Sequence, residues 1–303
     1  MREPAQIQLL ADGRRLHLHD GPIDLIVEAF GATAQVKAAY GAAAERFVTV
    51  LDELCGELSF LRQPARKGGP QAVGGIARRM VAAVAPYGEW TFITPMAAVA
   101  GAVAEEILDT MTSAAMLSRA YVNDGGDIAL HLATGERFVV GMVERPDRPS
   151  LFGTATLDST QPVRGIATSG WRGRSFSLGI ADAVTVLADR AAQADAAATI
   201  IANAVDLPGH PSVTRLPARC LAPDSDLGDR LVTQAVGELS LGEIAAALHA
   251  GVAVAQRLFS CGLIRSAALH LRGATRVVGS VWEDPAQCFL RQETLQATSL
   301  QLL

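Results

Sequence analysis

The sequence predicts an α+β fold, in which antiparallel sheets pack with helices in a single domain spanning residues 1–303. Short runs of alternating residues joined by turn dipeptides occur near both ends of the chain. Long stretches with helical periodicity lie between them, and this mixed order does not fit regular βαβ winding. Half of the residues are hydrophobic, so the chain can bury a sizeable core.

The first predicted elements are strands. Residues 5–10 and 14–19 flank an Asp-Gly turn and predict a β-hairpin, to which residues 23–29 add a third strand. The apolar residues of Thr33–Leu61 recur at intervals of three and four, which predicts an amphipathic helix. Two further helices are expected after a break rich in glycine and proline.

These two helices cover residues 75–85 and 96–111. The second begins behind Thr94-Pro95, a cap residue followed by a first-turn proline. Four strand-like runs follow and predict an antiparallel meander, at residues 120–122, 128–132, 137–143 and 153–157.

The last part of the chain predicts two strands pairing as a hairpin, one further strand and two helices. The strands are expected at residues 183–187, 267–271 and 275–278, and the helices at residues 194–205 and 239–259. Pro208 and Pro211 end the first helix. The second is rich in alanine and suits either a buried position or the interface of a homodimer.

Charge and composition restrict the partners. The 26 basic and 31 acidic residues are scattered, with a net charge of −5, so we expect neither nucleic acid nor a membrane as a partner. A small anionic or nucleotide-like ligand is the expectation. The basic residues between 62 and 79 predict a solvated loop, with phosphate as the ligand if this loop binds one.

The sequence predicts a cytoplasmic protein. The N-terminal residues show no signal-peptide pattern, and no apolar stretch approaches the roughly 20 residues of a membrane span. Widely spaced cysteines fit reduced thiols better than disulfides or a zinc site. These cysteines are Cys55, Cys220, Cys261 and Cys288.

Two polar segments are candidate ligand sites. The first, Asn123-Asp124-Gly125-Gly126-Asp127, has paired glycines that let a backbone approach a ligand closely, and equally fits a hairpin turn. The second is a predicted loop that begins with Thr168-Ser169-Gly170 and continues with Trp171, Arg172 and Arg174. Hydroxyls and guanidiniums together can hold phosphate, although an ordinary surface loop has the same composition. Trp171 either stacks on a ligand or anchors this loop.

Asp195 and Thr199 are candidate metal ligands. They stand four apart on a predicted helix, so their oxygens share one face and suit a hard cation such as Mg²⁺. The alternative is an acid near the helix N-terminus beside a threonine bonded to its own backbone. Asp182 either adds a carboxylate or orients the loop. His17 and His19 face one side of a strand and fit ordinary residues of an exposed face, because a metal site there needs a third ligand.

Three segments together resemble the ApbE family of flavin transferases. Residues 121–128, 166–170 and 194–199 follow the order of its Asn-x-Gly-Gly-Asp, Ala-Thr-Ser-Gly and Ala-Asp-Ala-x-Ala-Thr motifs. Residues 94–101 and 179–186 are similar to the UPF0280 branch of the same superfamily. The resemblance implies a T-fold-related architecture of sheets and helices, with two halves and a pocket between them.

The resemblance implies a ligand, a metal ion and a set of site residues for this chain. ApbE proteins bind FAD and Mg²⁺ and transfer FMN to a threonine of a target protein, or hydrolyse FAD. By position, Asn123, Gly125, Gly126 and Asp127 would line the nucleotide site. Thr168 and Ser169 would lie near phosphate, with Arg172 and Arg174 contacting the anion. Asp195 and Thr199 would hold Mg²⁺.

The sequence departs from the family pattern at two places, which leaves functions other than flavin transfer open. Glu105 stands where ApbE proteins carry a lysine, and residues 174–179 replace their His-x-x-Asp-Pro segment. We therefore expect binding of a small anionic or nucleotide-like ligand on an ApbE-like fold. Two alternatives stay open: a non-catalytic binding or assembly protein, and a metabolite hydrolase whose water is held by Asp127 or Asp182.

Overall fold

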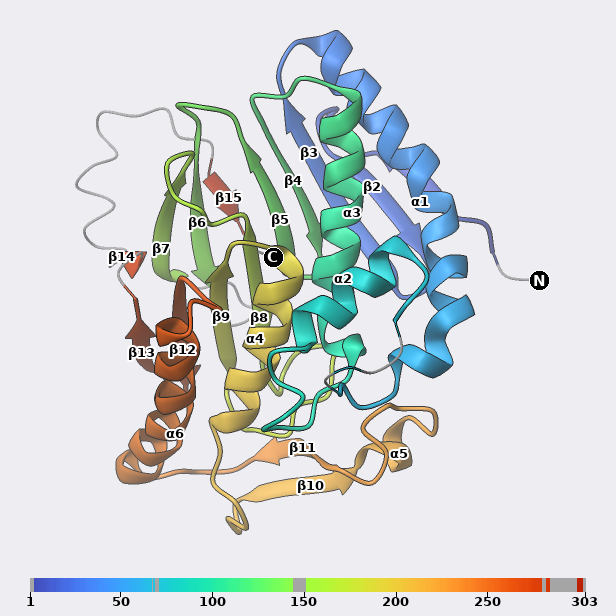
Figure 1. Ribbon diagram of the computed structural model, residues 1–303. Coiled ribbons are helices and arrows are strands. Elements are labelled where there is room, and N and C mark those ends of the chain that lie inside the picture. Colours follow the sequence, from blue (N-terminus) through green and yellow to red (C-terminus); the bar gives the residue numbers. More distant parts are fainter. Residues whose placement is uncertain are drawn as a thin grey trace. The chain divides into compact units, whose positions relative to one another are not determined.

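The computed structural model describes residues 3–66, 68, 71–143, 151–279, 282–283 and 299–301. Its helices and antiparallel sheets confirm the α+β class (Figure 1). The chain forms two compact units. The first holds Met1–Arg137, Asp158–Ile166 and Asp189–Asp195, and the second holds Phe138–Leu157, Ala167–Ala188 and Ala196–Leu303.

The first unit is built on an antiparallel sheet with the strand order β1-β2-β3-β4-β5. Its strands are β1 (Gln6–Leu9), β2 (Leu16–Asp20), β3 (Ile23–Phe30), β4 (Arg119–Asp124) and β5 (Asp127–Leu132). Alternation along β2 buries Leu16 and Leu18 and turns the intervening residues outward. The three N-terminal strands are confirmed, with small differences at their ends.

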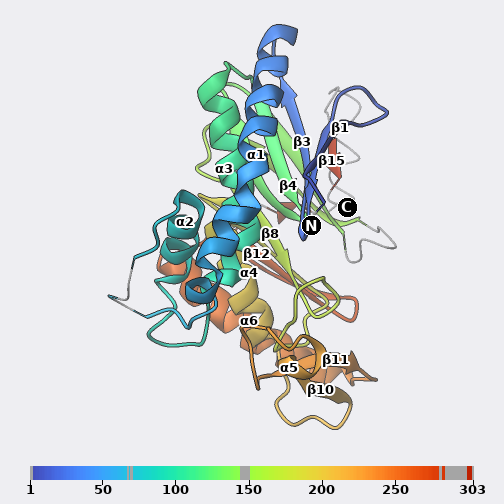
Figure 2. The ribbon, with the colours of Figure 1, turned by 90° about the vertical axis from the view of Figure 1, so that its right-hand side faces the viewer.

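Helices cover one face of this sheet (Figure 2). They are α1 (Thr33–Leu61), α2 (Gly75–Val84), the short 3₁₀ helix η1 (Pro95–Ala98) and α3 (Val99–Ala114). The bounds of α1 match the prediction, because its apolar stripe buries Phe47, Val50 and Leu54. The predicted helix at 96–111 is divided into η1 and α3. Pro95 occupies the first turn as expected, but the Thr94 side chain makes no capping hydrogen bond.

The second unit contains a two-stranded sheet, a four-stranded sheet, further antiparallel strands and two helices. Its strands are β6 (Arg137–Val143), β7 (Leu151–Asp158), β9 (Ala183–Ala188), β10 (Val213–Pro217), β11 (Leu231–Val236), β12 (Ser266–Leu271), β13 (Ala274–Val278), β14 (Trp282–Glu283) and β15 (Ser299–Gln301). Its helices are α5 (Ala218–Leu221) and α6 (Leu241–Ser260). Strand β8 (Gly165–Ser169) and helix α4 (Ala191–Ala204) each run from the first unit into the second.

Helix α6 buries one face and exposes the other, so the expected homodimer interface stays a prediction. It packs on β12 and β13 through Ile244, Leu248 and Leu258. Ser240 caps it, since its hydroxyl accepts the Glu243 N–H while the Glu243 side chain returns to the Ser240 N–H. This capping box, absent from the prediction, explains why the helix begins at residue 241 rather than 239.

The predicted meander is wrong at one step, from β5 to β6, because β6 lies beside β7 as expected but not beside β5. Strands β4 and β5 pair as expected. The other edge of β5 pairs with β8, where Ile128 lies opposite Ile166. Strands β6 and β7 belong to a separate four-stranded sheet with β14 and β15. A local pattern of residues specifies a strand but not its long-range partner, which is why neighbours in sequence were wrongly paired.

Two further boundaries differ from the prediction. Thr168 and Ser169 close strand β8 rather than lying in a loop. Helix α4 begins at Ala191, three residues early, because its first turn is capped by the side chain of Glu105, which is distant in sequence. No helix in the part of the chain that the structure describes is long and apolar enough to cross a membrane.

Candidate functional site

The segment from Asn123 to Asp127 forms a tight turn between β4 and β5. Gly125 and Gly126 both have positive φ, +62° and +110°, which explains the glycine pair. The Asn123 side-chain oxygen accepts the Gly126 N–H at 2.8 Å. The hairpin interpretation is therefore confirmed, and a ligand role for this turn stays a prediction.

Asp195 lies on the first turns of α4 and reaches the start of α3. Its Oδ2 accepts the Gly101 N–H at 3.1 Å. The N–H groups of a helix's first turn have no partner within the helix, so this carboxylate satisfies one of them. Glycine is required at 101, because a Cβ there would lie 2.4 Å from the Ala191 carbonyl oxygen.

Asp195 also has an unusual charge environment. Although the residue is only half-buried, its carboxyl group is surrounded by protein, and this burial raises the pKa of Asp195 to about 7. The Asp124 carboxylate raises the pKa further. Asp124 is itself 5% exposed. The fold thus brings the turn motif and the Asp195 motif together within the first unit as two neighbouring carboxylates.

Glu105, on α3, makes the converse contact with α4. Its Oε1 accepts the Ala192 N–H at 2.9 Å, while its other oxygen lies 3.2 Å from Arg79 and 3.3 Å from Arg190. Each of the helices α3 and α4 therefore supplies a carboxylate that accepts an N–H in the first turn of the other helix. Because a helix N-terminus attracts anions, Glu105 occupies a position that an external phosphate would otherwise favour.

In the second unit, Asp182 organises the loop that follows β8. Its Oδ1 accepts bonds from the Trp171 Nε1 at 3.2 Å and the Arg172 Nε at 2.8 Å, and its Oδ2 accepts the Arg272 N–H at 2.7 Å. The Arg172 guanidinium stacks on the Trp171 ring at 4.3 Å. Of the alternatives, Asp182 orients the loop and Trp171 anchors it.

The remaining predicted residues lie close to this loop or on α4. Thr168 is exposed, with its hydroxyl 2.9 Å from that of Thr185, and Ser169 is half-buried. Arg174 is exposed. Thr168, Ser169, Arg172 and Arg174 therefore gather in the second unit. Thr199 is half-buried on α4, one turn after Asp195.

Comparison with known proteins decides the family. The model of a family described as AbpE bacteria matches residues 7–277. The chain belongs to this ApbE-like family. It also resembles UPF0280 proteins, as the motifs indicated. That of Methanopyrus kandleri is 39% identical over 138 residues, which is 45% of this chain and 50% of that protein.

Other relatives are similar over comparable lengths. The UPF0280 protein of Methanococcoides burtonii is 37% identical over 139 residues, covering 46% of this chain and 55% of its own length. The chain thus spans about half the length of the curated relatives that it matches.

Two solved structures align with most of this chain. A variant of the flavin transferase ApbE from Vibrio cholerae has a TM-score of 0.45 at 12% identity, over 91% of this chain and 96% of that one. The apo flavinyl transferase ApbE of Pseudomonas stutzeri has a TM-score of 0.42 at 11% identity, over 91% and 95%.

Within the ApbE-like family, the acid at position 105 has a structural role. Glu105 is 6% exposed and is bonded to α4 and to two arginines, so it is part of the packing of the first unit. A lysine here would face Arg79 and Arg190.

Sequence reasoning missed Asp124 as a site residue. It lies within the turn motif, yet its side chain was not among the candidates. Its position at the end of β4, before two glycines, was the available signal, but its proximity to Asp195 depends on the tertiary fold.

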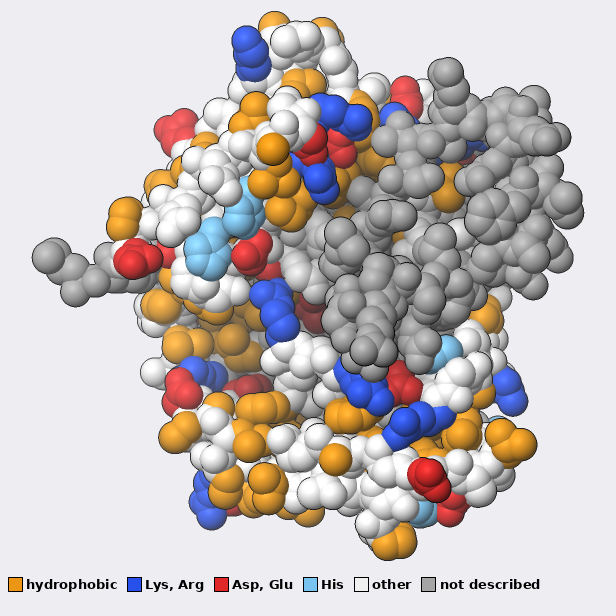
Figure 3. All heavy atoms as spheres, turned by 180° about the vertical axis from the view of Figure 1, so that it is seen from behind, with side chains coloured by type: hydrophobic (Ala, Val, Ile, Leu, Met, Phe, Trp, Pro, Cys, Tyr) orange, Lys and Arg blue, Asp and Glu red, His pale blue; other side chains and the backbone are white. Residues whose placement is uncertain are grey.

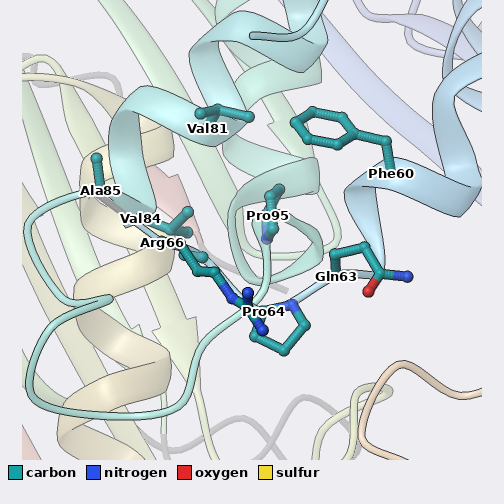
Figure 4. Close-up of a pocket in the computed structure, with 9 residues that line it drawn as sticks. Phe60, Gln63, Pro64, Arg66, Val81, Val84, Ala85 and Pro95 are labelled. Atoms are coloured by element: carbon teal, nitrogen blue, oxygen red, sulfur yellow. The ribbon is translucent and has the colours of Figure 1, made fainter. Parts of the chain in front are cut away.

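An apolar cavity in the first unit was also not predicted (Figure 4). It measures about 260 Å³ and is bounded by Phe60 of α1, Val81 and Val84 of α2, and Pro95 of η1. Of the residues with a predicted ligand role, only Arg66, from the basic segment 62–79, lines it. It has the size and apolar walls to receive a small hydrophobic group.

Proposed function

We propose that the protein binds a small anionic or nucleotide-like ligand together with Mg²⁺, held by Asp195 and Thr199. The observation that carries this proposal is the pair of neighbouring carboxylates, Asp195 and Asp124, in a protein-enclosed setting. Carboxylate and hydroxyl oxygens are the donors that Mg²⁺ prefers, so the residues present fit this ion. When bound, Mg²⁺ would neutralise charge on the two acids and on ligand phosphates.

The remaining candidate residues supply recognition of the ligand. The exposed Gly125 and its neighbours Asn123, Gly126 and Asp127 offer backbone and side-chain groups to a nucleotide. The hydroxyls of Thr168 and Ser169 and the guanidiniums of Arg172 and Arg174 offer donors to phosphate. FAD is the first nucleotide to test, given the family. We further propose a cytoplasmic location, which the free thiols of Cys55, Cys220 and Cys261 support.

A second candidate is a non-catalytic binding or assembly protein. Glu105 favours it, because the residue at the family's lysine position serves helix packing. The hydrolase alternative draws less support at Asp182, whose two carboxylate oxygens accept three protein donors.

Calorimetry with FAD, FMN and ATP tests the proposal, each titrated with and without Mg²⁺. We expect one of them to bind in an Mg²⁺-dependent manner, and Asp195→Asn to weaken that binding at least about tenfold. Asp109→Asn, which changes an exposed acid on α3, is the matched control and should bind normally. Binding without transfer of FMN to protein would favour the second candidate. If none of the three binds, the nucleotide proposal is refuted.

A further inference from the structure

The outward face of the hairpin β2–β3 gathers two histidines and an aspartate. His17 and His19 are two residues apart on β2 and so point to the same side. His19 lies directly opposite Asp24 in the strand register, which places the Asp24 side chain on that side too. Figure 3, which views the molecule from behind, shows two histidine side chains side by side with an acidic one next to them.

The three side chains converge on one point. Asp24 Oδ1 lies 2.9 Å from His17 Nε2, and Asp24 Oδ2 lies 3.4 Å from His19 Nδ1. One ligand atom from each residue lies within 4.8 Å of the other two. Ligands bonded to one tetrahedral zinc ion at about 2.1 Å stand roughly 3.4 Å apart. All three side chains are half-buried, so the small rotations needed disturb no core packing.

His19 supplies a second observation. Its Nδ1 is shielded from solvent but makes no hydrogen bond, since its approach to Asp24 lacks the required geometry. A buried polar atom without a partner costs free energy. This nitrogen lies 3.4 Å from the Asp24 carboxylate, and a cation bound between them would give it a partner.

A residue on β1 can support the arrangement from outside. Gln8 lies opposite His17 in the register, with its side-chain amide 3.4 Å from the His17 Nδ1. By turning about its last bond, Gln8 can present its carbonyl oxygen to an Nδ1–H. This hydrogen bond would fix the tautomer that leaves the His17 Nε2 lone pair for a metal, as carbonyl groups commonly do behind metal-bound histidines.

We propose that His17, His19 and Asp24 bind a divalent transition metal of the zinc class. Imidazole nitrogens favour such ions over Mg²⁺, whereas a carboxylate accepts both. With three protein ligands, a fourth position is open to water or to a ligand oxygen. The metal would join β2 to β3. This site is independent of the proposed Mg²⁺ ligands Asp195 and Thr199.

Titration of the untagged protein with Co²⁺, in buffer containing millimolar Mg²⁺, tests the proposal. Co²⁺ takes zinc-like sites and reports on them through visible ligand-field absorption. We expect one equivalent of Co²⁺ to produce this absorption and one equivalent of Zn²⁺ to abolish it. His19→Gln and Asp24→Asn should each weaken binding at least about tenfold, as the loss of a ligand requires.

Two control variants distinguish this site from isolated surface histidines and from the proposed Mg²⁺ site. His249→Gln removes an exposed histidine on α6 and should leave Co²⁺ binding unchanged. Asp195→Asn removes the proposed Mg²⁺ ligand and should also leave it unchanged. The proposal is overturned if folded wild-type protein gives no absorption with Co²⁺. It is equally overturned if the His19 and Asp24 variants, folded by circular dichroism, bind Co²⁺ as tightly as wild type.

Discussion

At the scale of single residues, a few side chains explain how the first unit is held together. Gly101 permits the close backbone approach of α3 and α4, and Asp195 uses that approach to accept an N–H of α3. The same approach places the Asp195 carboxyl in a protein environment beside Asp124. The close approach of α3 and α4 therefore also accounts for the raised pKa of Asp195.

Gly101→Ala should destabilise the protein by about 2–4 kcal/mol, because the added Cβ must displace backbone rather than a flexible side chain. Urea denaturation measures the change. Gly56→Ala, on an exposed part of α1 with nothing within 4 Å of the new Cβ, is the matched control. It should stabilise the protein by up to about 1 kcal/mol. Equal effects at both positions would contradict the close approach.

The Asp195 carboxyl should make stability depend on pH in metal-free buffer. Its pKa in the folded protein, about 7, lies above the ordinary value of 3.8, so the folded state holds a proton that the unfolded state has lost. This contribution to stability is present below about pH 4 and is lost as the pH rises to about 7. Asp195→Asn should flatten the curve between these values in thermal melts. A variant curve parallel to that of wild type would show that Asp195 titrates normally.

At the scale of elements, helices α3 and α4 stabilise each other through their first turns. Glu105 caps α4 and Asp195 caps α3, so two helix N-termini are satisfied by acids from the partner helix. This explains why α4 begins earlier than its sequence indicates. Local sequence contains the capping box of α6, but it cannot contain a cap supplied by another helix.

Glu105→Lys, which reverses the charge at this position, should destabilise the protein by about 3–5 kcal/mol. It would place a third cation between Arg79 and Arg190 and remove the cap of α4. Glu105→Gln keeps the shape and one acceptor, and should cost less. Chemical denaturation of both variants measures the difference. If the lysine variant is as stable as wild type, position 105 has no packing role.

At the scale of the whole molecule, sequence was informative wherever structure is local. The stripe of α1 and the hairpin β12–β13 follow from the spacing of apolar residues and from turns, and both were predicted. The pairing of β5 with β8 was not, because nothing near Ile128 indicates Ile166 as its partner. The same limit applies to the candidate sites. Motifs indicated Asp195 as a candidate, whereas the proximity of Asp124 to it, and of Asp24 to the two histidines, required the fold.

We propose that the protein holds an anionic ligand with Mg²⁺ through Asp195. Mass spectrometry of untagged protein, purified under native conditions in Mg²⁺, identifies any ligand that stays bound. We expect a small anionic or nucleotide-like molecule to copurify with wild type and with Asp109→Asn, and to be lost from Asp195→Asn and after removal of Mg²⁺. A ligand that the Asp195 variant retains equally would contradict the claim.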